Sequence, residues 1–213
     1  MTYPFKLSDA NVGSYVKYTG NNGCSGTACA GGNVSTSYTT SGWRIAYSKD
    51  ETAYLTSAGS PEVMCTSSDG TAGTSCASSE SKAGVPQHRA NLNAKALTYC
   101  NSVYAYDGIC NSNSAWNMNY VDFNQITGIS ISTGTESSIS NSVARTLISN
   151  GGSYWFDVGS GNPAGCYFWS SENLSTSINY TSSSYGIRPV LRLRSSVKVI
   201  SGLGTYADPY VIE

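Results

Sequence analysis

The chain has 213 residues, a net charge of −1 and a charged fraction of 12%, which is about half the usual share for soluble domains. Nucleic acids and anionic membranes attract proteins with a basic excess, so this charge balance argues against both classes of partner. Aromatic residues make up 11% of the chain, which is too many for a disordered protein, and the length predicts a single domain over residues 1–213.

Uncharged polar residues dominate the composition, with 22 Gly, 16 Tyr and abundant Ser and Thr. Such a surface is solvated by hydroxyls and amides, as in exported, adhesive or filament-forming proteins, and we expect an extracellular or cell-surface location. The first residues lack a basic region followed by an apolar run, so we expect the export segment to be absent from this chain. No window of about 18 apolar residues occurs in the sequence, and we expect no direct membrane insertion.

The first third of the chain predicts strands and loops. Alternating side chains predict a hairpin whose first strand carries Trp43, Ile45 and Tyr47 on one face. Residues 49–51 supply its turn. The expected strands cover residues 13–19, 43–48 and 52–57, and a turn-rich insertion follows over residues 58–86.

Three helices are expected in the middle of the chain. The first covers residues 88–103, where one stripe is formed by Ala90, Ala94, Leu97 and Tyr104. Asn119 and Asp122, three residues apart, resemble a capping box that opens a short helix with Phe123 and Ile126 inward. A third helix, ended by an Asn-Gly-Gly sequence, is indicated by apolar residues spaced by four: Ile139, Val143 and Leu147.

The last third of the chain predicts short strands, over residues 154–158, 166–170, 185–194, 196–200 and 205–212. Strands and helices do not alternate along the sequence, and the helices cluster in the middle. This pattern predicts an α+β fold in which central helices pack against twisted antiparallel sheets and long loops join the elements.

Two stretches of the sequence carry a resemblance to a known fold. Residues 94–126 combine a predicted helix, a cysteine-flanked loop, a Trp and a short capped helix, and residues 167–193 combine a Trp-Ser-Ser turn with a closing strand that holds an Arg. In this order they resemble the bacterial C-type-lectin-like fold, in its formylglycine-generating-enzyme-like branch. The end of the chain is similar to the tail of exported pilin-like proteins. The resemblance implies a C-type-lectin-like scaffold that displays recognition loops, with core positions at Ala94, Ala96, Tyr99, Cys100, Trp116, Asn119, Phe123, Ile126, Trp169 and Arg188.

The seven cysteines favour a protein stapled by disulfides outside the cytosol. Six of them form close neighbours that bracket loops rich in small polar residues: Cys24 with Cys29, Cys65 with Cys76, and Cys100 with Cys110. Six cysteines allow fifteen connectivities, of which this neighbour pairing is the expected one. A zinc site is the alternative, but no C-x₂-C pair occurs and His88 is the single histidine, so we expect no metal. Cys166 is expected to be a buried thiol.

Ligand recognition is expected in the loops of residues 160–185. Tyr gives a large contact area at low entropic cost, and Ser and Asn adapt their hydrogen bonds, as recognition surfaces require. In C-type-lectin-like scaffolds this region commonly faces the ligand. The candidate ligand-binding residues are Tyr167, Glu172, Asn173, Asn179, Tyr180 and Tyr185. An ordinary solvated loop is the alternative interpretation.

Other chemistries have weaker signals. A calcium-dependent sugar site needs carboxylates beside a Pro and after a Trp, and the sequences around Pro163 and Trp169 lack them. We expect no catalytic residues or cofactor, because His88 has no elbow-type nucleophile and no paired active-site cysteines stand out. Three arginines alternate with apolar residues and are predicted to share one strand face, where they either bind an anion or pair with acids: Arg188, Arg192 and Arg194.

These observations predict a non-enzymatic bacterial surface adhesin or ligand-binding module, whose partner is a host or bacterial surface glycan or protein. A structural subunit or head of a pilus or other extracellular filament is the alternative, in which the partners are copies of the same chain. A degenerate enzyme of the formylglycine-generating type is the third hypothesis.

The disulfide framework predicts how many cysteines react with an alkylating reagent before and after reduction. We expect at most one alkylated cysteine in the unreduced, unfolded protein and seven after reduction, because only Cys166 lacks a neighbour. Intact mass before and after reduction measures both numbers. Six or seven modified cysteines in the unreduced protein would contradict the extracellular interpretation.

Overall fold

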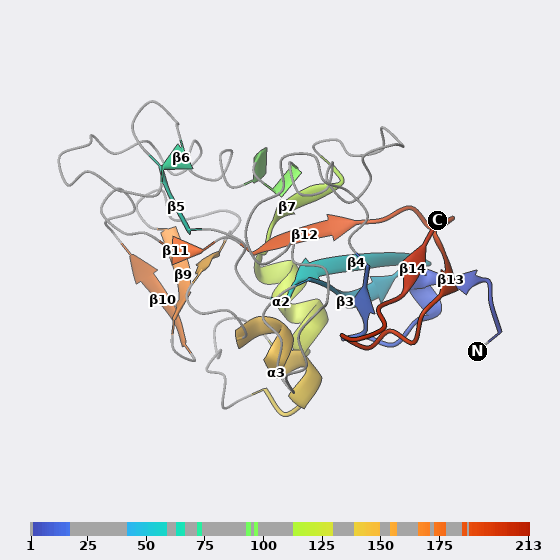
Figure 1. Ribbon diagram of the computed structural model, residues 1–213. Helices are drawn as coiled ribbons and strands as arrows, with labels where there is room; N and C mark the ends of the chain where they lie inside the picture. The colour runs from blue at the N-terminus through green and yellow to red at the C-terminus, as the bar shows by residue number, and fades with distance from the viewer. Residues whose placement is uncertain are drawn as a thin grey trace.

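The computed structural model describes residues 2–17, 42–58, 63–66, 72–73, 93–94, 96–97, 113–129, 139–149, 154–156, 166–170, 173–177, 185–186 and 188–213. Over these residues the protein is an α+β structure, as predicted, with helices gathered beside sheets of mainly antiparallel strands (Figure 1). None of the helices in the described ranges is long and apolar enough to cross a membrane.

A five-stranded antiparallel sheet forms the centre, in the order β2-β3-β4-β12-β7. Its strands are β2 (Tyr15–Val16), β3 (Trp43–Lys49), β4 (Thr52–Ser57), β12 (Pro189–Arg192) and β7 (Ala115–Asn117). Strands from both ends of the chain therefore meet in one sheet, and β12 lies between the early strand β4 and the middle strand β7.

The β3–β4 hairpin confirms the sequence prediction. Asp50 and Glu51 form its turn with φ angles of 50° and 59°, as a tight hairpin with right-handed strand twist requires. The predicted alternation holds at Trp43 and Ile45, which are fully buried, but a bulge lies between Ile45 and Tyr47. The bulge adds one residue to β3, and as a result Ala46 is buried as well. Tyr47 lies opposite Tyr54 and Ile45 opposite Leu55, so the predicted common face was wrong at Tyr47, which faces the other side of the sheet from Trp43 and Ile45.

Helix α2 (Tyr120–Thr127) is the predicted capped helix. The Asn119 side chain accepts hydrogen bonds from the backbone N–H groups of Val121 and Asp122, at 2.8 and 3.1 Å, and Asp122 accepts from the Asn119 N–H at 3.0 Å. Phe123 and Ile126 are buried, as predicted. Of the expected helix over residues 88–103, residues 93–94 and 96–97 are described, and all four are helical. Ala96 is buried as expected, whereas Ala94, expected in the core stripe, is exposed.

Helix α3 (Ser142–Ser149) confirms the predicted third helix but corrects its buried face. The Asn141 side chain caps the helix by accepting from the N–H groups of Val143 and Ala144. This start turns Ala144, Leu147 and Ile148 inward and leaves Val143 36% exposed. The expectation that Val143 faces the core was therefore wrong, because the buried stripe of the helix runs through Ala144, Leu147 and Ile148, and Val143 lies beyond its edge.

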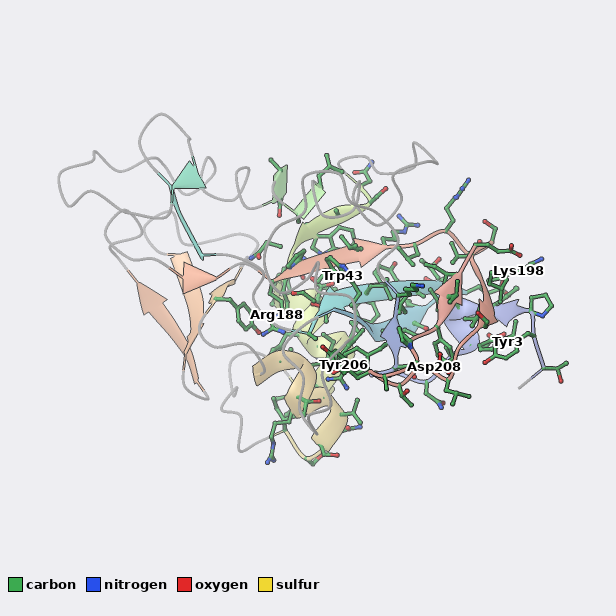
Figure 2. The ribbon with its side chains drawn as sticks, viewed as in Figure 1. Tyr3, Trp43, Arg188, Lys198, Tyr206 and Asp208 are labelled. Carbon is green, nitrogen blue, oxygen red and sulfur yellow. The ribbon has the colours of Figure 1, made fainter. Side chains whose placement is uncertain are left out.

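The main core lies between these two helices and one face of the central sheet. It contains Ala46, Tyr47, Met118, Phe123, Ile126, Ile139, Ala144, Leu147, Ile148, Tyr154 and Val190. Arg188, labelled in Figure 2, enters it as a fully buried cation. Its guanidinium lies 4.5 Å from the centre of the Tyr154 ring. Its Nη1 donates to the carbonyls of Ser57 and Leu147, at 3.0 and 3.2 Å. Burial lowers the pKa of Arg188, and the nearby ring opposes that shift.

The buried position of Arg188 corrects the predicted row of three arginines. Arg192 and Arg194 are exposed, whereas Arg188 lies inside the molecule, just before β12 begins. The predicted strand 185–194 is in fact divided, because residues 185–186 pair in another sheet and Pro189 starts β12 in the central one. The three guanidiniums therefore do not form one anion-binding row.

Two further sheets flank the central one. The three-stranded sheet has the order β1-β13-β14 and joins both ends of the chain, through β1 (Phe5–Lys6), β13 (Lys198–Ser201) and β14 (Val211–Ile212) (Figure 1). The other sheet has the order β10-β9-β8-β11-β5-β6, with strands at Asn173–Ser177, Cys166–Ser170, Tyr154–Phe156, Tyr185–Gly186, Val63–Thr66 and Ala72–Gly73. Its β8–β11 pair is parallel. Strand β9 has its predicted bounds, whereas β5 and β6 form a hairpin inside the segment expected to hold only turns.

A pair of glycine substitutions tests the packing of the terminal sheet. Gly202 and Gly128 both have positive φ angles, 91° and 73°, but a Cβ at Gly202 would overlap the backbone carbonyl of Pro209, whereas one at Gly128 meets nothing within 4 Å. We expect Gly128→Ala to lower the free energy of unfolding by about 1 kcal/mol and Gly202→Ala by about 3 kcal/mol or more. Urea denaturation of both variants measures the difference, and equal losses would contradict the described β13–β14 packing.

Candidate functional site

One face of the central sheet carries a row of polar and aromatic side chains. Tyr47 on β3 pairs with Tyr54 on β4, and Tyr54 pairs with Arg192 on β12. Residues directly opposite each other on neighbouring strands point to the same face of a sheet. Trp116 belongs to the same face, because it lies opposite Val190, two residues before Arg192.

One part of this face is buried in the core, and another part lines an open hollow. Around Tyr47 it is covered by helix α2, whereas Tyr54 and Trp116 are only half-buried and Arg192 is exposed. A hollow of about 510 Å³ lies there, within the range of about 300–1,000 Å³ that is usual for small-molecule sites. It is lined by Tyr47, Lys49, Tyr54, Asn113, Trp116, Asn119, Val121, Asp122, Gln125 and Arg192, which we call the aromatic–cationic hollow.

Three aromatic rings form the wall of the aromatic–cationic hollow. The Tyr47 and Tyr54 rings are stacked, with centroids 4.3 Å apart and planes inclined by 15°. The Trp116 ring follows Tyr54 at 6.2 Å and an inclination of 59°. The three rings therefore form a stepped aromatic wall rather than one plane, and Tyr54 and Trp116 are its half-buried members that a ring-shaped ligand can reach.

A buried carboxylate fixes this wall to helix α2. Asp122 is 1% exposed, and its Oδ1 accepts a hydrogen bond from the Tyr47 hydroxyl at 2.7 Å. Its Oδ2 accepts from Trp116 Nε1 at 2.8 Å and from the Asn119 N–H at 3.0 Å. One side chain thus holds two rings of the wall and the first turn of α2 in a fixed relation.

The protonation of Tyr47 is secured by the same contact. Burial and the neighbouring Asp122 carboxylate both raise the pKa of Tyr47 far above its ordinary value. The hydroxyl therefore stays protonated at physiological pH and remains a donor to Asp122. Because its proton is committed in this way, Tyr47 acts as a supporting residue rather than as an acid or base.

Two cations stand at the open side of the hollow. Lys49 and Arg192 are both exposed, and within the described residues neither side chain forms a hydrogen bond or an ion pair. The described carboxylate in the lining is Asp122, whose two oxygens already accept three hydrogen bonds. The accessible charge of the hollow is therefore positive, while the negative charge is buried behind the rings.

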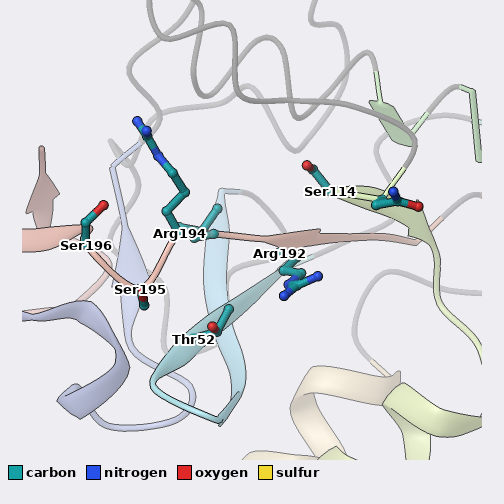
Figure 3. A pocket seen from close by; sticks show the side chains of 8 residues that line it. Thr52, Ser114, Arg192, Arg194, Ser195 and Ser196 are labelled. Atoms are coloured by element: carbon teal, nitrogen blue, oxygen red, sulfur yellow. The ribbon is translucent and has the colours of Figure 1, made fainter.

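A second, more polar hollow of about 440 Å³ adjoins the first and shares Asn113 and Arg192 with it. Hydroxyl side chains line it, among them Thr52, Ser195 and Ser196. Figure 3 shows that the Arg192 side chain turns toward Thr52, whereas Arg194 points the opposite way. The two guanidiniums therefore do not converge on one point, and Arg192 is the cation that the two hollows share.

The predicted ligand-binding residues are placed differently. The backbones of Tyr167, Asn173 and Tyr185 lie in β9, β10 and β11 of the six-stranded sheet, and Asn173 pairs with Ser170 across a hairpin. Part of the expected loop is thus a strand. Glu172, Asn179 and Tyr180 lie outside the described residues.

Two of the seven cysteines lie in described residues. Cys65 lies in β5, opposite Gly73 of β6, and Cys166 lies in β9. The other expected disulfide partners lie outside the described residues: Cys24, Cys29, Cys76, Cys100 and Cys110. Across the described ranges, no three His, Cys, Asp or Glu side chains are grouped as metal ligands would be.

The aromatic–cationic hollow was missed at the sequence level. Its members come from β3, β4, β7, α2 and β12, which are distant along the chain, and only the sheet brings them together. Partial signals were present, since Asn119 and Asp122 were recognised as a cap and Arg192 as a possible anion ligand. No protein-family model, no curated protein and no solved structure matches this chain.

Replacing the buried carboxylate tests whether it organises the wall. We expect Asp122→Asn to lower the free energy of unfolding by about 2–4 kcal/mol, because the amide has no charge to strengthen these hydrogen bonds and can accept at only one of the two oxygen positions. Tyr47→Phe removes one donor and should cost about 1–2 kcal/mol. Urea denaturation measures both, and a loss below about 0.5 kcal/mol for Asp122→Asn would contradict the assigned role.

Proposed function

We propose that this protein is a non-enzymatic ligand-binding module displayed on a bacterial cell surface, and that its ligand occupies the aromatic–cationic hollow. The observation that carries the proposal is the combination of a rigid aromatic wall with two cations that have no partner among the described residues. An exposed cation beside an aromatic surface is well placed to meet an anionic or polar ligand.

The chemistry of the lining supports binding rather than catalysis. Asp122 is engaged by three donors and Tyr47 holds its proton, so neither is available for proton transfer. The remaining polar side chains, such as Asn113 and Gln125, form hydrogen bonds but do not titrate at physiological pH. Binding energy here comes from contact area and hydrogen bonds.

The scaffold that we propose is C-type-lectin-like, from the resemblance of the sequence, and export is proposed from the composition and the cysteines. In that fold the 160–185 region commonly faces the ligand, so it is a second candidate surface beside the hollow. The two surfaces lie on different sheets, since β9, β10 and β11 belong to the six-stranded sheet and the hollow to the central one. Variants can therefore separate them.

A filament subunit remains the second candidate function, because apolar side chains are exposed where the chain ends meet. Leu203 is 71% exposed, and Ile200 and Tyr3 are exposed beside it, where the Tyr3 hydroxyl donates to the Gly202 carbonyl. Burial of such groups between copies would favour self-assembly. Size-exclusion chromatography with negative-stain microscopy separates the two functions, since a monomer supports the binding module and filaments support the subunit.

We expect a binding partner to be lost when the hollow is altered. The protein is first tested against arrays of surface glycans and host surface proteins. The same arrays are then probed with a hollow variant, Tyr54→Ser with Arg192→Ala, and a loop variant, Tyr180→Ala with Tyr185→Ala. The hollow variant should bind at least about tenfold more weakly, because a half-buried ring and a cation are removed together.

Lys17→Ala is the matched control, since it removes an exposed cation that follows β2 beside the start of β3, at the opposite end of that strand from Lys49. Loss of binding in the loop variant alone would move the site to residues 160–185. Unchanged binding in both variants would overturn recognition through either surface.

A further inference from the structure

We infer that the ligand of the aromatic–cationic hollow is an acidic sugar, whose ring packs on Tyr54 and Trp116 and whose carboxylate is held by Lys49 and Arg192. This inference rests on the proposed function and specifies its ligand class. Four features of the hollow lead to it: the shape of its wall, the polarity of its lining, the sign of its accessible charge and the limited number of its cations.

The wall fits a ring with polarised C–H groups. An aromatic face carries partial negative charge, which attracts the slightly positive C–H hydrogens on one face of a sugar ring. Tyr54 and Trp116 are half-buried, so both rings are held in place and part of each still reaches solvent, while the stacked Tyr47 ring covers one face of Tyr54. A long apolar ligand fits less well, because Val121 is the one aliphatic hydrocarbon side chain in the described lining.

The rest of the lining fits a ligand with many hydroxyl groups. Gln125 and Asn113 line the hollow with side-chain amides that can both donate and accept hydrogen bonds. A hydroxyl group also donates and accepts, so amides and hydroxyls satisfy each other without a charge. The neighbouring hollow extends this polar surface through Thr52, Ser195 and Ser196, which leaves room for a further sugar unit.

The positive charge at the open side of the hollow favours a sugar that carries a negative charge over a neutral one. Lys49 and Arg192 contribute two positive charges at the open side, and the single described carboxylate of the lining is buried and saturated by donors. A guanidinium binds a carboxylate through two parallel hydrogen bonds, which fixes its direction as well as its distance. Arg192 can supply this fork because its side chain is exposed and lies between the two hollows.

The number of cations argues against a nucleic acid. Strong binding to a phosphate backbone uses many basic side chains, whereas this lining has two and the whole chain has a net charge of −1. One carboxylate per sugar matches the hollow better than a dense row of phosphates does.

The test uses matched pairs of acids and their methyl esters. Sialyllactose and trigalacturonate are each titrated into the protein, beside their methyl esters, by calorimetry at low ionic strength. We expect at least one acid to bind about tenfold or more tightly than its ester, because the ester keeps the ring and removes the charge. Arg192→Gln should abolish this difference, and Arg192→Lys should restore part of it.

Lys17→Gln is the matched control, since it removes an exposed positive charge at the end of β3 opposite to Lys49, outside the linings of both hollows. Circular dichroism and thermal unfolding confirm that each variant is folded. An equal loss of acid preference in Lys17→Gln would assign the effect to general electrostatics and overturn the inference.

The two proposals fail in different ways. If neither acid binds more tightly than its ester, while another array ligand still depends on Tyr54, the acidic-sugar inference is wrong and the proposed function stands. If no ligand found on the arrays responds to changes in the hollow, the proposed function is wrong, and the inference falls with it.

Discussion

The structure around the hollow depends on one buried carboxylate. Asp122 draws together strand β3 through Tyr47, strand β7 through Trp116 and the start of helix α2 through Asn119. A buried charge costs several kcal/mol unless donors replace its lost water. Three donors do so here, so the carboxylate is tolerated only while all three elements hold their places. The three hydrogen bonds that allow Asp122 to be buried therefore also hold Tyr47, Trp116 and the start of α2 in a fixed geometry.

The sheet face shows how a core and a binding surface can share one set of strands. Towards helices α2 and α3 the face is covered, and Tyr47 and Val190 belong to the core. The helices do not cover Tyr54, on the strand next to Tyr47, or Arg192, two residues after Val190. Tyr54 is therefore half-buried and Arg192 is exposed. The boundary is fixed by where α2 lies, and the position of α2 is fixed by its cap at Asn119 and by Asp122. Local capping thus decides how much of the sheet is left open for a ligand.

Sequence patterns were sufficient where neighbours in the chain determine the structure. The β3–β4 hairpin, the capped helix α2 and strand β9 follow from alternation, capping residues and an aromatic run, all within about ten residues. Val143 was misassigned because a spacing of four does not say on which side of Leu147 the buried stripe lies, and here it runs toward Ala144 and Ile148. Arg188 was misassigned because an interior cation needs acceptors from β4 and α3, which no local pattern reveals.

The hollow is a harder case for the same reason. Tyr54 and Arg192 are adjacent in the sheet but 138 positions apart in the sequence, by the difference of their numbers. Trp116 was identified as a core position from the resemblance alone, and its second role beside Tyr54 depends on strand order. Composition indicated the kind of surface, rich in Tyr and uncharged polar groups, but could not indicate where those groups would gather.

A low overall charge has a consequence for recognition at such a site. With 12% charged residues, the field of the whole protein is weak, so a charged ligand is guided by the two local cations over about one Debye length, roughly 8 Å in physiological salt. Under the proposed function, one shallow hollow would therefore bind selectively at close range rather than fast or tightly. A protein displayed in many copies on a surface does not need tight single sites, because linked binding events raise the overall avidity by about 10²–10⁴-fold. A rigid hollow suits the surface display that we propose, since rigidity preserves selectivity while the number of copies supplies strength.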